Sequence, residues 1–341
     1  MRVFLAALLA ILAAGCANIA PSPHGYEIVA KYFVGGPGGW DYVSIDEKRH
    51  HLFVGRTDRV QVIDTGTGRV VGELALGGVH GVAIAQELGL GFTSNGRTDS
   101  VTVFDLATLA VIDTVKVTGK NPDAILYEPL SRRVLTFNGG SANVTVIDAA
   151  SRKVVGTISV SGKPEFAVAD ERGRVFVNIE DKNSLAVIDP ASLKVSSEWP
   201  LAGCDEPTGL DIDRAAGRLF SVCGNRKMMV IDSKGGEIVA TLPIGASVDG
   251  VVFDAAKDLT FSSNGEGTVT IVRKDRAGHY GVLGNLETQR SARTIALESS
   301  THRLYLPAAS YAPAAGPAPG QPSPRPSMIE DSFVILVLAP G

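Results

Sequence analysis

The feature that most constrains the fold of this chain is a short sequence motif that recurs every 41 to 43 residues. Each copy alternates apolar and polar residues, and the clear copies end in aspartate. A polar turn and a second alternating stretch follow. Alternation with a period of two predicts a half-buried β-strand, and regular recurrence predicts a repeat architecture. The clear copies occupy residues 60–64, 101–105, 144–148, 185–189 and 228–232, and a degenerate copy occupies residues 269–273.

A further strand of the repeat can be registered seven times, at spacings of 39 to 44 residues. Four strands per repeat and seven repeats predict an all-β, seven-bladed β-propeller with four antiparallel strands in each blade. Residues 26–341 are expected to form one domain, because no single blade can cover its own flat faces. The seven registered strands are residues 41–46, 80–85, 123–128, 165–170, 208–213, 249–254 and 293–298.

The two ends of the repeat region complement each other. Only one strand, residues 332–339, remains after the strand at 302–308, so the last blade lacks its outermost strand. Residues 26–34 match the missing strand, and we expect them to close the last blade and remove its open edge. Residues 312–327, between strands of that blade, are rich in Pro and Ala and predict an extended loop.

The N-terminal segment has the composition of a targeting sequence. Its apolar stretch, residues 3–14, is too short to span a bilayer. The residues around Cys16 resemble the lipobox of bacterial lipoproteins, which implies a signal peptide over 1–15, a lipid on Cys16 and a tether over 16–25. By the same resemblance, Ala17 in place of Asp implies an outer-membrane anchor on the periplasmic side. The alternative is a secretory signal that is cleaved by the general peptidase.

Composition and charge exclude several classes of protein. A formal net charge of -4 argues against nucleic-acid binding, which needs a concentrated basic face. A hydrophobic content of 45% excludes wholesale disorder. No apolar run of spanning length follows the N-terminal segment, so contact with a membrane is expected only through the lipid anchor. We expect a monomer.

The amino-acid sequence of the repeat resembles that of a known group of proteins. Its instances include GKNPD at 119–123, GKPE at 162–165 and RVFVN at 174–178. These phrases resemble the YVTN-type β-propeller repeat proteins, often labelled YncE-like, of the WD40/YVTN repeat-like superfamily. The resemblance covers residues 26–341 and implies the propeller fold. It implies no particular activity, because the group includes surface-layer, periplasmic and uncharacterised members.

The innermost strands of a propeller start at one face, so residues far apart in the chain meet around the mouth of the axial channel. We expect this polar ring to bind a ligand. The alternative is that the ring is simply solvated and that its Asp and Asn residues serve as turn formers. The strand entries contribute Asp41, His80, Asp123, Glu165, Thr208, Asp249 and Arg293, and the ends of the second strands contribute Asn95, Asn138, Asn178, Glu180, Asn225 and Asn264.

The same ring predicts a site for a divalent cation. Its many oxygen ligands would favour Ca²⁺ or Mg²⁺, whereas the imidazole leaves Mn²⁺ or Zn²⁺ open. The alternative is again a solvated channel without a bound metal. The predicted ligands are His80, Asp123, Glu165 and Asp249.

Two cysteines remain beside the one expected to carry lipid. Cys204 precedes the fifth inner strand and Cys223 ends the second strand of the same blade, so both lie on the face of the channel mouth. A secreted chain with two such thiols predicts a disulfide. The alternatives are two free buried thiols or a thiol metal site.

The sequence favours a non-catalytic binding protein over an enzyme. We expect a lipid-anchored envelope propeller that presents its channel mouth to an envelope protein, a glycan or a small ligand. The chain has no nucleophile-elbow, zinc-protease or haem-attachment motif. The alternative is a metal-dependent hydrolase of the lactonase type, in which the carboxylate ring holds a cation that polarises a carbonyl. That alternative rests partly on analogy with other propellers.

Overall fold

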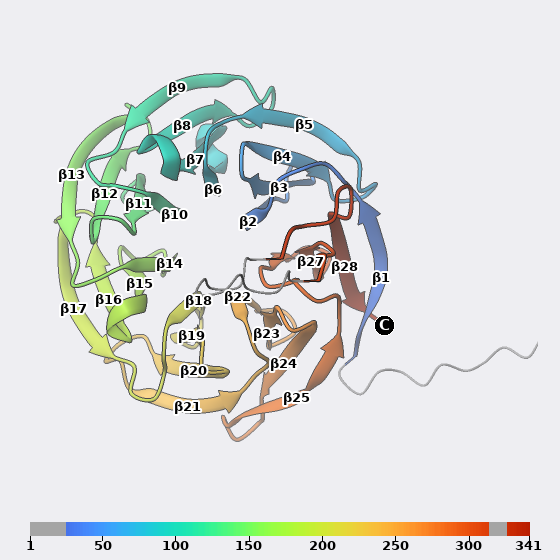
Figure 1. The fold of residues 1–341 in the computed structure, drawn as a ribbon. Helices are drawn as coiled ribbons and strands as arrows, with labels where there is room; N and C mark the ends of the chain where they lie inside the picture. The colour runs from blue at the N-terminus through green and yellow to red at the C-terminus, as the bar shows by residue number, and fades with distance from the viewer. Residues whose placement is uncertain (1–24, 314–325) are drawn as a thin grey trace, which may run out of the picture.

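The chain folds as a ring of seven four-stranded antiparallel sheets (Figure 1). The computed structural model describes residues 25–313 and 326–341. The predicted signal peptide, nearly all of the tether and most of the 312–327 loop therefore lie outside the described residues. Within these ranges the chain has 28 strands and three single-turn 3₁₀ helices. No helix there is long and apolar enough to cross a membrane.

In the first six sheets the strands follow one another from the axis to the rim in chain order (Figure 1). The first three sheets are β2 (Trp40–Asp46), β3 (His51–Arg56), β4 (Arg59–Asp64) and β5 (Val70–Ala75); β6 (Val79–Ala85), β7 (Leu90–Asn95), β8 (Ser100–Asp105) and β9 (Val111–Lys116); and β10 (Pro122–Glu128), β11 (Arg133–Asn138), β12 (Asn143–Asp148) and β13 (Lys153–Ser159). The 3₁₀ helices η1 (Gln86–Leu88) and η2 (Gly96–Thr98) flank β7.

The next three sheets repeat this plan. They are β14 (Pro164–Ala169), β15 (Val175–Ile179), β16 (Ser184–Asp189) and β17 (Lys194–Pro200); β18 (Pro207–Asp213), β19 (Arg218–Cys223), β20 (Lys227–Asp232) and β21 (Ile238–Pro243); and β22 (Val248–Asp254), β23 (Leu259–Asn264), β24 (Thr268–Lys274) and β25 (Tyr280–Glu287). The helix η3 (Glu180–Lys182) follows β15.

The seventh sheet joins the two ends of the chain. Its order is β26 (Ala296–Glu298), β27 (Arg303–Ala308), β28 (Val334–Pro340) and β1 (Tyr26–Phe33), so the N-terminal strand is outermost. The β1 strand lies at the rim beside β28 (Figure 1) and pairs with it in antiparallel fashion, Tyr26 opposite Pro340 and Phe33 opposite Val334. The predicted seven-bladed fold with closure by the N-terminal strand is confirmed. The inner strand expected at 293–298 is shorter, because regular pairing begins only at Ala296.

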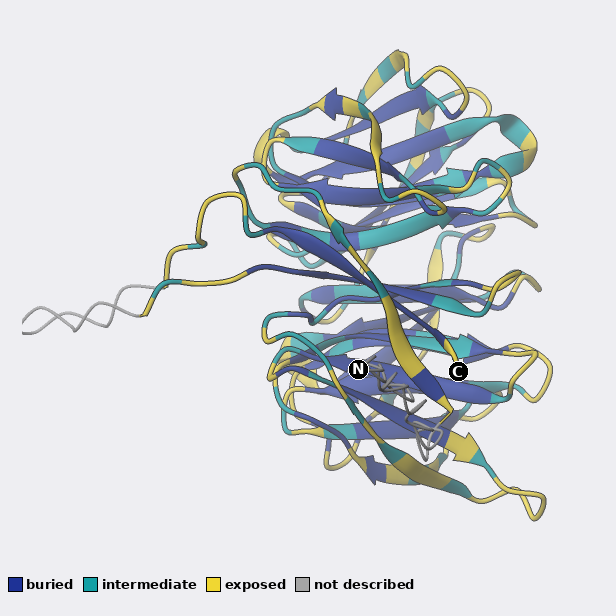
Figure 2. Ribbon diagram, turned by 90° about the vertical axis from the view of Figure 1, so that its right-hand side faces the viewer, coloured by how far each residue is buried: buried dark blue, intermediate teal, exposed yellow. Residues whose placement is uncertain are grey.

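The hydrophobic core lies between neighbouring blades, while exposed residues lie in the loops and on outermost strands such as β1 (Figure 2). The second strands of the first six blades each carry a phenylalanine that is fully buried. One of them, Phe53, packs against Phe104 of the next blade with ring centroids 5.7 Å apart. Burial of each such ring contributes about 2–3 kcal/mol. The six residues are Phe53, Phe92, Phe137, Phe176, Phe220 and Phe261.

The aspartate that ends the repeated motif shapes the turn that follows it. The Asp64 carboxylate accepts hydrogen bonds from the backbone N–H and the hydroxyl of Thr67, both at 2.7 Å. Asp105 makes the same pair of bonds with Thr108. Side chains that hydrogen-bond the backbone in this way stabilise tight turns. The aspartate of the repeated motif therefore stabilises the turn between the third and fourth strands of a blade and does not indicate a functional site.

The glycine-rich segment 35–39 connects the last blade to the first by surrounding one side chain. Arg56 is fully buried and donates hydrogen bonds to the backbone oxygens of Gly39 (3.0 Å), Pro37 (2.9 Å) and Gly38 (2.8 Å). The φ angles of the first, second and fourth residues of this segment are +66°, +77° and +87°, which glycine adopts without strain. The segment is thus a binding loop for a guanidinium group of the protein itself.

Candidate functional site

Six inner strands place their second residue at the same end of the ring. In each strand the ladder is interrupted just after the first residue; for example, β2 pairs Trp40 with Arg56 and resumes only at Val43. Such bulges turn nearby side chains away from the ladder. The six residues are Asp41, His80, Asp123, Glu165, Thr208 and Asp249, and Arg293 lies just before β26.

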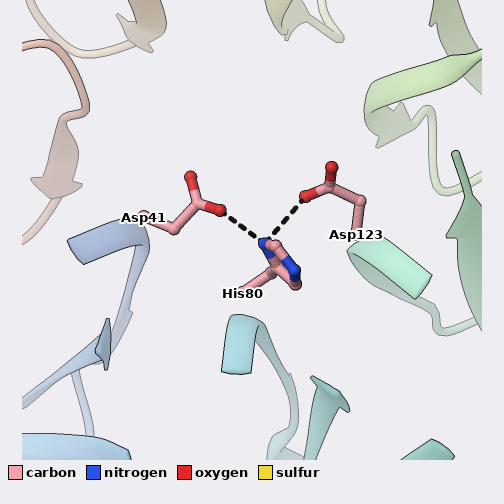
Figure 3. A group of neighbouring side chains, drawn as sticks. All are labelled: Asp41, His80 and Asp123. Carbon is pink, nitrogen blue, oxygen red and sulfur yellow. Dashed lines mark hydrogen bonds and ion pairs between the residues drawn. The ribbon is translucent and has the colours of Figure 1, made fainter. Parts of the chain in front are cut away.

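His80 lies between two carboxylates from the neighbouring blades (Figure 3). Its Nδ1 is 2.7 Å from Oδ2 of Asp41 and 3.3 Å from Oδ1 of Asp123. Potential ligand atoms of these three residues all lie within 4.8 Å of one another. The three inner strands β2, β6 and β10 therefore bring one imidazole and two carboxylates together.

The remaining charged residues of the ring form two further clusters. Arg293 donates from Nε to Asp249 at 2.7 Å, and its Nη2 is 3.8 Å from Oδ1 of Asp41. Lys163, which sequence reasoning did not include, forms ion pairs with Glu165 at 3.3 Å and with Glu180. We use the term channel mouth for Asp41, His80, Asp123, Lys163, Glu165, Glu180, Asp249 and Arg293.

The four predicted metal ligands lie in different clusters of the structure. Of the four predicted ligands, only His80 and Asp123 belong to the compact group within the described residues, and Asp41 completes it. Glu165 instead accepts a hydrogen bond from the hydroxyl of Tyr42 at 3.1 Å and pairs with Lys163. Asp249 pairs with Arg293. The physical reason is that each carboxylate turns toward the nearest cation, and the register of the strands does not reveal that choice.

The pKa values of the channel mouth reflect burial and an excess of carboxylates. Burial raises the pKa of Asp123 to about 6, and the charges of Asp41 and Asp249 add to this although His80 and Lys163 oppose it. Burial raises the pKa of Glu165 to about 8; the charges of Asp123 and Glu180 also raise it, whereas the charge of Lys163 lowers it. Both side chains are mostly buried, at 14% and 13% exposure. Their surroundings therefore favour the protonated form of both carboxyls.

For the imidazole of His80, in contrast, the surroundings favour the charged form. Burial is the largest influence on the pKa of His80 and lowers it, but the hydrogen bond to Asp41 and the charges of Asp123, Asp41 and Glu165 together outweigh burial. The pKa of His80 is therefore raised above its ordinary value. The surrounding carboxylates favour a positive charge at this position.

The asparagines expected in the ring have structural roles. Asn95, Asn138 and Asn264 are at most 2% exposed. Each donates from its amide to a threonine hydroxyl on the next strand of its own blade, at 3.0 Å in all three cases. The expected ligand-binding role of these three amides stays a prediction.

Three other expected residues also lie outside the channel-mouth network. Asn178 is buried and bridges two blades by donating to the backbone oxygens of Thr208 and Gly209. Asn225 donates to the backbone oxygen of Gly203 and to Asp205. Thr208 donates to the backbone oxygen of Val248 at 3.5 Å. The candidate site is therefore built from charged residues, not from amides or hydroxyls.

Two cavities adjoin the channel mouth. One of about 370 Å³ is lined by residues that include Trp40, Asp41, His80, Arg97 and Asn121. The other, of about 280 Å³, lies along the inner strands and is lined mainly by apolar side chains. Tyr42 lines this second cavity and also donates a hydrogen bond from its hydroxyl to Glu165 of the mouth. In the sequence, Tyr42 directly follows a ring residue, and Lys163 stands two residues before one, within the GKPE motif; neither had a further signal.

A disulfide joins Cys204 and Cys223 on the face of the mouth, with a Cα–Cα distance of 5.5 Å. Both residues are buried, at 1% and 0% exposure. The bond ties the segment before β18 to the end of β19. Closing a loop of this length contributes roughly 3 kcal/mol by the loop-entropy estimate.

The substitution Glu165→Gln is expected to stabilise the protein at high pH. A raised carboxyl pKa in the folded state means that stability is full below the unfolded value, near 4.5, and is lost as pH rises toward 8. Gln mimics the protonated form, so the variant should gain on the order of 2 kcal/mol at pH 9 and almost nothing at pH 4.5. Urea unfolding with EDTA present measures this difference. A matched change on the opposite face, Glu171→Gln, should show no such pH dependence, and equal gains at both pH values would contradict the prediction.

The comparisons with known proteins concern the fold alone. No protein-family model matches the chain, and no curated protein matches it. Its fold is similar to a chain in the structure "Kuenenia stuttgartiensis Hydrazine Synthase", with a TM-score of 0.71 and 18% identity over 82% of this chain and 95% of that one.

Two further solved structures share the fold at lower sequence identity. A chain in "Crystal Structure of Mitotic Checkpoint Complex" has a TM-score of 0.74 and 12% identity, over 99% of this chain and 98% of that chain. The chain in "Structure of U3-55K" also has a TM-score of 0.74, with 10% identity over 93% and 99%. Fold and topology together define the class of this protein as a seven-bladed β-propeller. Function must be argued from the site, because one fold hosts many activities.

Proposed function

We propose that this propeller is a binding protein whose channel mouth receives a positively charged segment of another protein. The observation that carries the proposal is the surplus of negative charge. Once Glu165 is ionised, above its pKa of about 8, five carboxylates stand against Lys163 and Arg293, and both of these cations are already in ion pairs. A further cation would relieve the repulsion among the carboxylates, and charge complementarity of this kind favours a specific partner. The carboxylates are Asp41, Asp123, Glu165, Glu180 and Asp249.

The shape of the site supports a side chain as the entering group. The cavity of about 370 Å³ opens beside Asp41 and His80 and includes the wall formed by Trp40. A Lys or Arg side chain has a long apolar stem and a charged tip. Such a chain could pass along Trp40 and place its charge near the carboxylates. A macromolecular partner is also in keeping with a fold that occurs in a structure titled as a complex.

The cell envelope is the proposed location, with a lipid on Cys16 anchoring the protein to the outer membrane on the periplasmic side. The resemblance to a lipobox and to YVTN-type proteins supports this location. The Cys204–Cys223 disulfide supports an oxidising compartment. Metabolic labelling with palmitate, compared between the natural protein and Cys16→Ser, tests the anchor, and equal labelling of both would refute it.

Fluorescence anisotropy with a labelled peptide that alternates Gly with Arg and Lys tests the binding function. We expect the basic peptide to bind and a matched Glu peptide not to bind. At pH 9, where both carboxyls are ionised, the double variant Asp123→Asn/Glu165→Gln should bind at least about tenfold more weakly, since two of the five carboxylates are neutralised. Raising the salt concentration should weaken binding as well.

The matched control for this test is Glu171→Gln, which removes one carboxylate from an exposed turn at the opposite end of β14. It should bind the basic peptide as the natural protein does. Equal binding by all variants, or binding of the Glu peptide with similar strength, would overturn the proposal.

A metal-dependent hydrolase of the lactonase type is the second candidate function. The specific observation in its favour is the compact group of Asp41, His80 and Asp123 beside a cavity. Three protein ligands with an open position are the pattern of catalytic metal sites. Lactone hydrolysis assayed with and without added Zn²⁺ tests this candidate, and rates equal to those of a buffer blank in both conditions would exclude it.

A further inference from the structure

We propose that Asp41, His80 and Asp123 form a binding site for one first-row divalent metal ion, with Zn²⁺ as the best-fitting member of that class. This proposal rests on the proposed function in one respect, namely that the channel mouth is a binding site for cations. It goes further by assigning the ligand atoms: Nδ1 of His80 and one carboxylate oxygen from each aspartate (Figure 3).

Two of the three distances between ligand atoms are close to those expected around a metal of this size, and all three are below 4.8 Å. Ligands roughly 2.0–2.1 Å from a tetrahedral ion lie roughly 3.3 Å from one another. Nδ1 of His80 is 3.3 Å from Oδ1 of Asp123 and 2.7 Å from Oδ2 of Asp41. One contact already has the spacing expected around the ion, and the other needs a shift of about half an ångström. Rotation of the Asp41 carboxylate, which is 26% exposed, can supply that shift.

The backbone around the three ligands is held in place by neighbouring blades. The hydroxyl of Thr294 donates to the backbone oxygen of Asp41 at 3.1 Å, and the hydroxyl of Ser94 donates to that of Asp123. The imidazole lies against Gly96, where a Cβ atom would be only 2.6 Å from Nε2 of His80. Because the ligands come from strands fixed in this way, little ordering is needed when an ion binds.

The donor set selects the class of metal. One imidazole nitrogen and two carboxylate oxygens suit Zn²⁺ and its first-row neighbours. Ca²⁺ takes six to eight oxygen ligands, and the compact group offers only two carboxylates. Two carboxylates also balance the double charge of the ion. The earlier expectation of an oxygen-rich Ca²⁺ or Mg²⁺ site is thus replaced by a site that depends on the imidazole.

The surroundings leave a coordination position accessible and supply a second layer of charge. The cavity of about 370 Å³ borders Asp41 and His80, so a water molecule or a partner's side chain can reach the ion. Arg293 stands 3.8 Å from the other oxygen of Asp41 while it pairs with Asp249 at 2.7 Å. Partners of this kind orient metal ligands without binding the ion.

Metal titration of the full chain after EDTA treatment and dialysis tests the proposal. The probes are Zn²⁺ in calorimetry, Co²⁺ for the visible absorption of a low-symmetry site, and Ca²⁺ for comparison. We expect one Zn²⁺ per chain and displacement of Co²⁺ by Zn²⁺. The variants His80→Gln and Asp123→Asn should each bind Zn²⁺ at least about tenfold more weakly. Far-ultraviolet circular dichroism checks that each variant is folded.

The control variant is Glu171→Gln, which neutralises an exposed carboxylate outside the channel mouth and should keep the affinity of the natural protein for Zn²⁺. Less than about 0.2 Zn²⁺ per chain, equal Zn²⁺ affinity in all variants, or equal weakening by Glu171→Gln would each overturn the proposal. The basic peptide described above separates the two proposals. Peptide binding without Zn²⁺ binding refutes the metal site alone, whereas Zn²⁺ binding without peptide binding refutes the basic partner alone.

Discussion

A protein that begins at Val34, and so lacks β1, is expected to show no cooperative thermal unfolding. Removal of β1 leaves the seven-residue strand β28 with an unpaired edge. The last blade would then retain only three strands, and its innermost strand β26 has three residues. An exposed, apolar edge of this kind favours aggregation.

The packing of Tyr26 explains why the loss should be large. Tyr26 is 2% exposed, and its ring centroid lies 4.8 Å from that of Phe261 in the sixth blade. Its hydroxyl donates to the backbone oxygen of His302. The β1 strand thus links the last two blades as well as closing the ring. Its loss should cost more than about 5 kcal/mol, comparable to the whole stability of many domains.

Circular dichroism on heating, dye binding and size-exclusion chromatography measure this effect. The matched control begins at Gly25, so that it lacks the same N-terminal segment but retains β1, and it should unfold in one sharp transition. If the two proteins unfolded at temperatures within a few degrees of each other, closure by β1 would not be needed for stability.

The substitution Arg56→Met is expected to lower the free energy of unfolding by about 3–5 kcal/mol, because a buried donor with many partners is removed. The guanidinium donates to Gln61 at 2.6 Å as well as to the oxygens of segment 35–39, and it lies 3.8 Å from the ring centroid of Phe333. Met fills the volume but leaves the carbonyl oxygens without donors. The segment that joins the seventh blade to the first would lose its anchor.

Arg56→Lys separates charge from shape. Lysine keeps the positive charge, but its single ammonium cannot reach all of the oxygens that the planar guanidinium contacts. We expect a loss of about 2–3 kcal/mol, from the hydrogen bonds that stay unmade. Burial lowers the pKa of Arg56 to about 10, so the group stays charged at neutral pH.

Urea unfolding of both variants measures these losses. Arg69→Met makes the same chemical change at an exposed position and should alter stability by less than about 0.5 kcal/mol. A loss below about 1 kcal/mol in Arg56→Met would show that the buried arginine does not anchor the segment.

The candidate site shows where prediction from sequence was sufficient and where it was not. The register of the repeat correctly brought Asp41, His80 and Asp123 to one face, because equivalent strand positions in a ring occupy equivalent places. The same register predicted Asn95 as a ligand-binding residue of the ring without indicating the partner of its amide. Its amide is buried and bonds to Thr102 on the adjacent strand, a choice that depends on side-chain direction within the blade.

The segment 35–39 gives a second example. Its glycines are obvious in the sequence, yet their partner Arg56 lies 17 or more residues away, in a strand of the next blade. Nothing in the local pattern identifies a buried arginine, because arginine is usually found at the surface. Only the packing of the first blade against the seventh reveals it.

The amino-acid sequence by itself determined the number of blades, the order of the strands and the closure of the ring. These properties follow from short-range patterns, namely alternation within strands and turn residues between them, repeated seven times. The tertiary structure alone decided which carboxylate meets which cation at the channel mouth. That choice depends on distances between blades and on burial, which differ from blade to blade even though the repeat is nearly the same. His80 therefore joins Asp41 and Asp123, while Glu165 and Asp249 turn to Lys163 and Arg293.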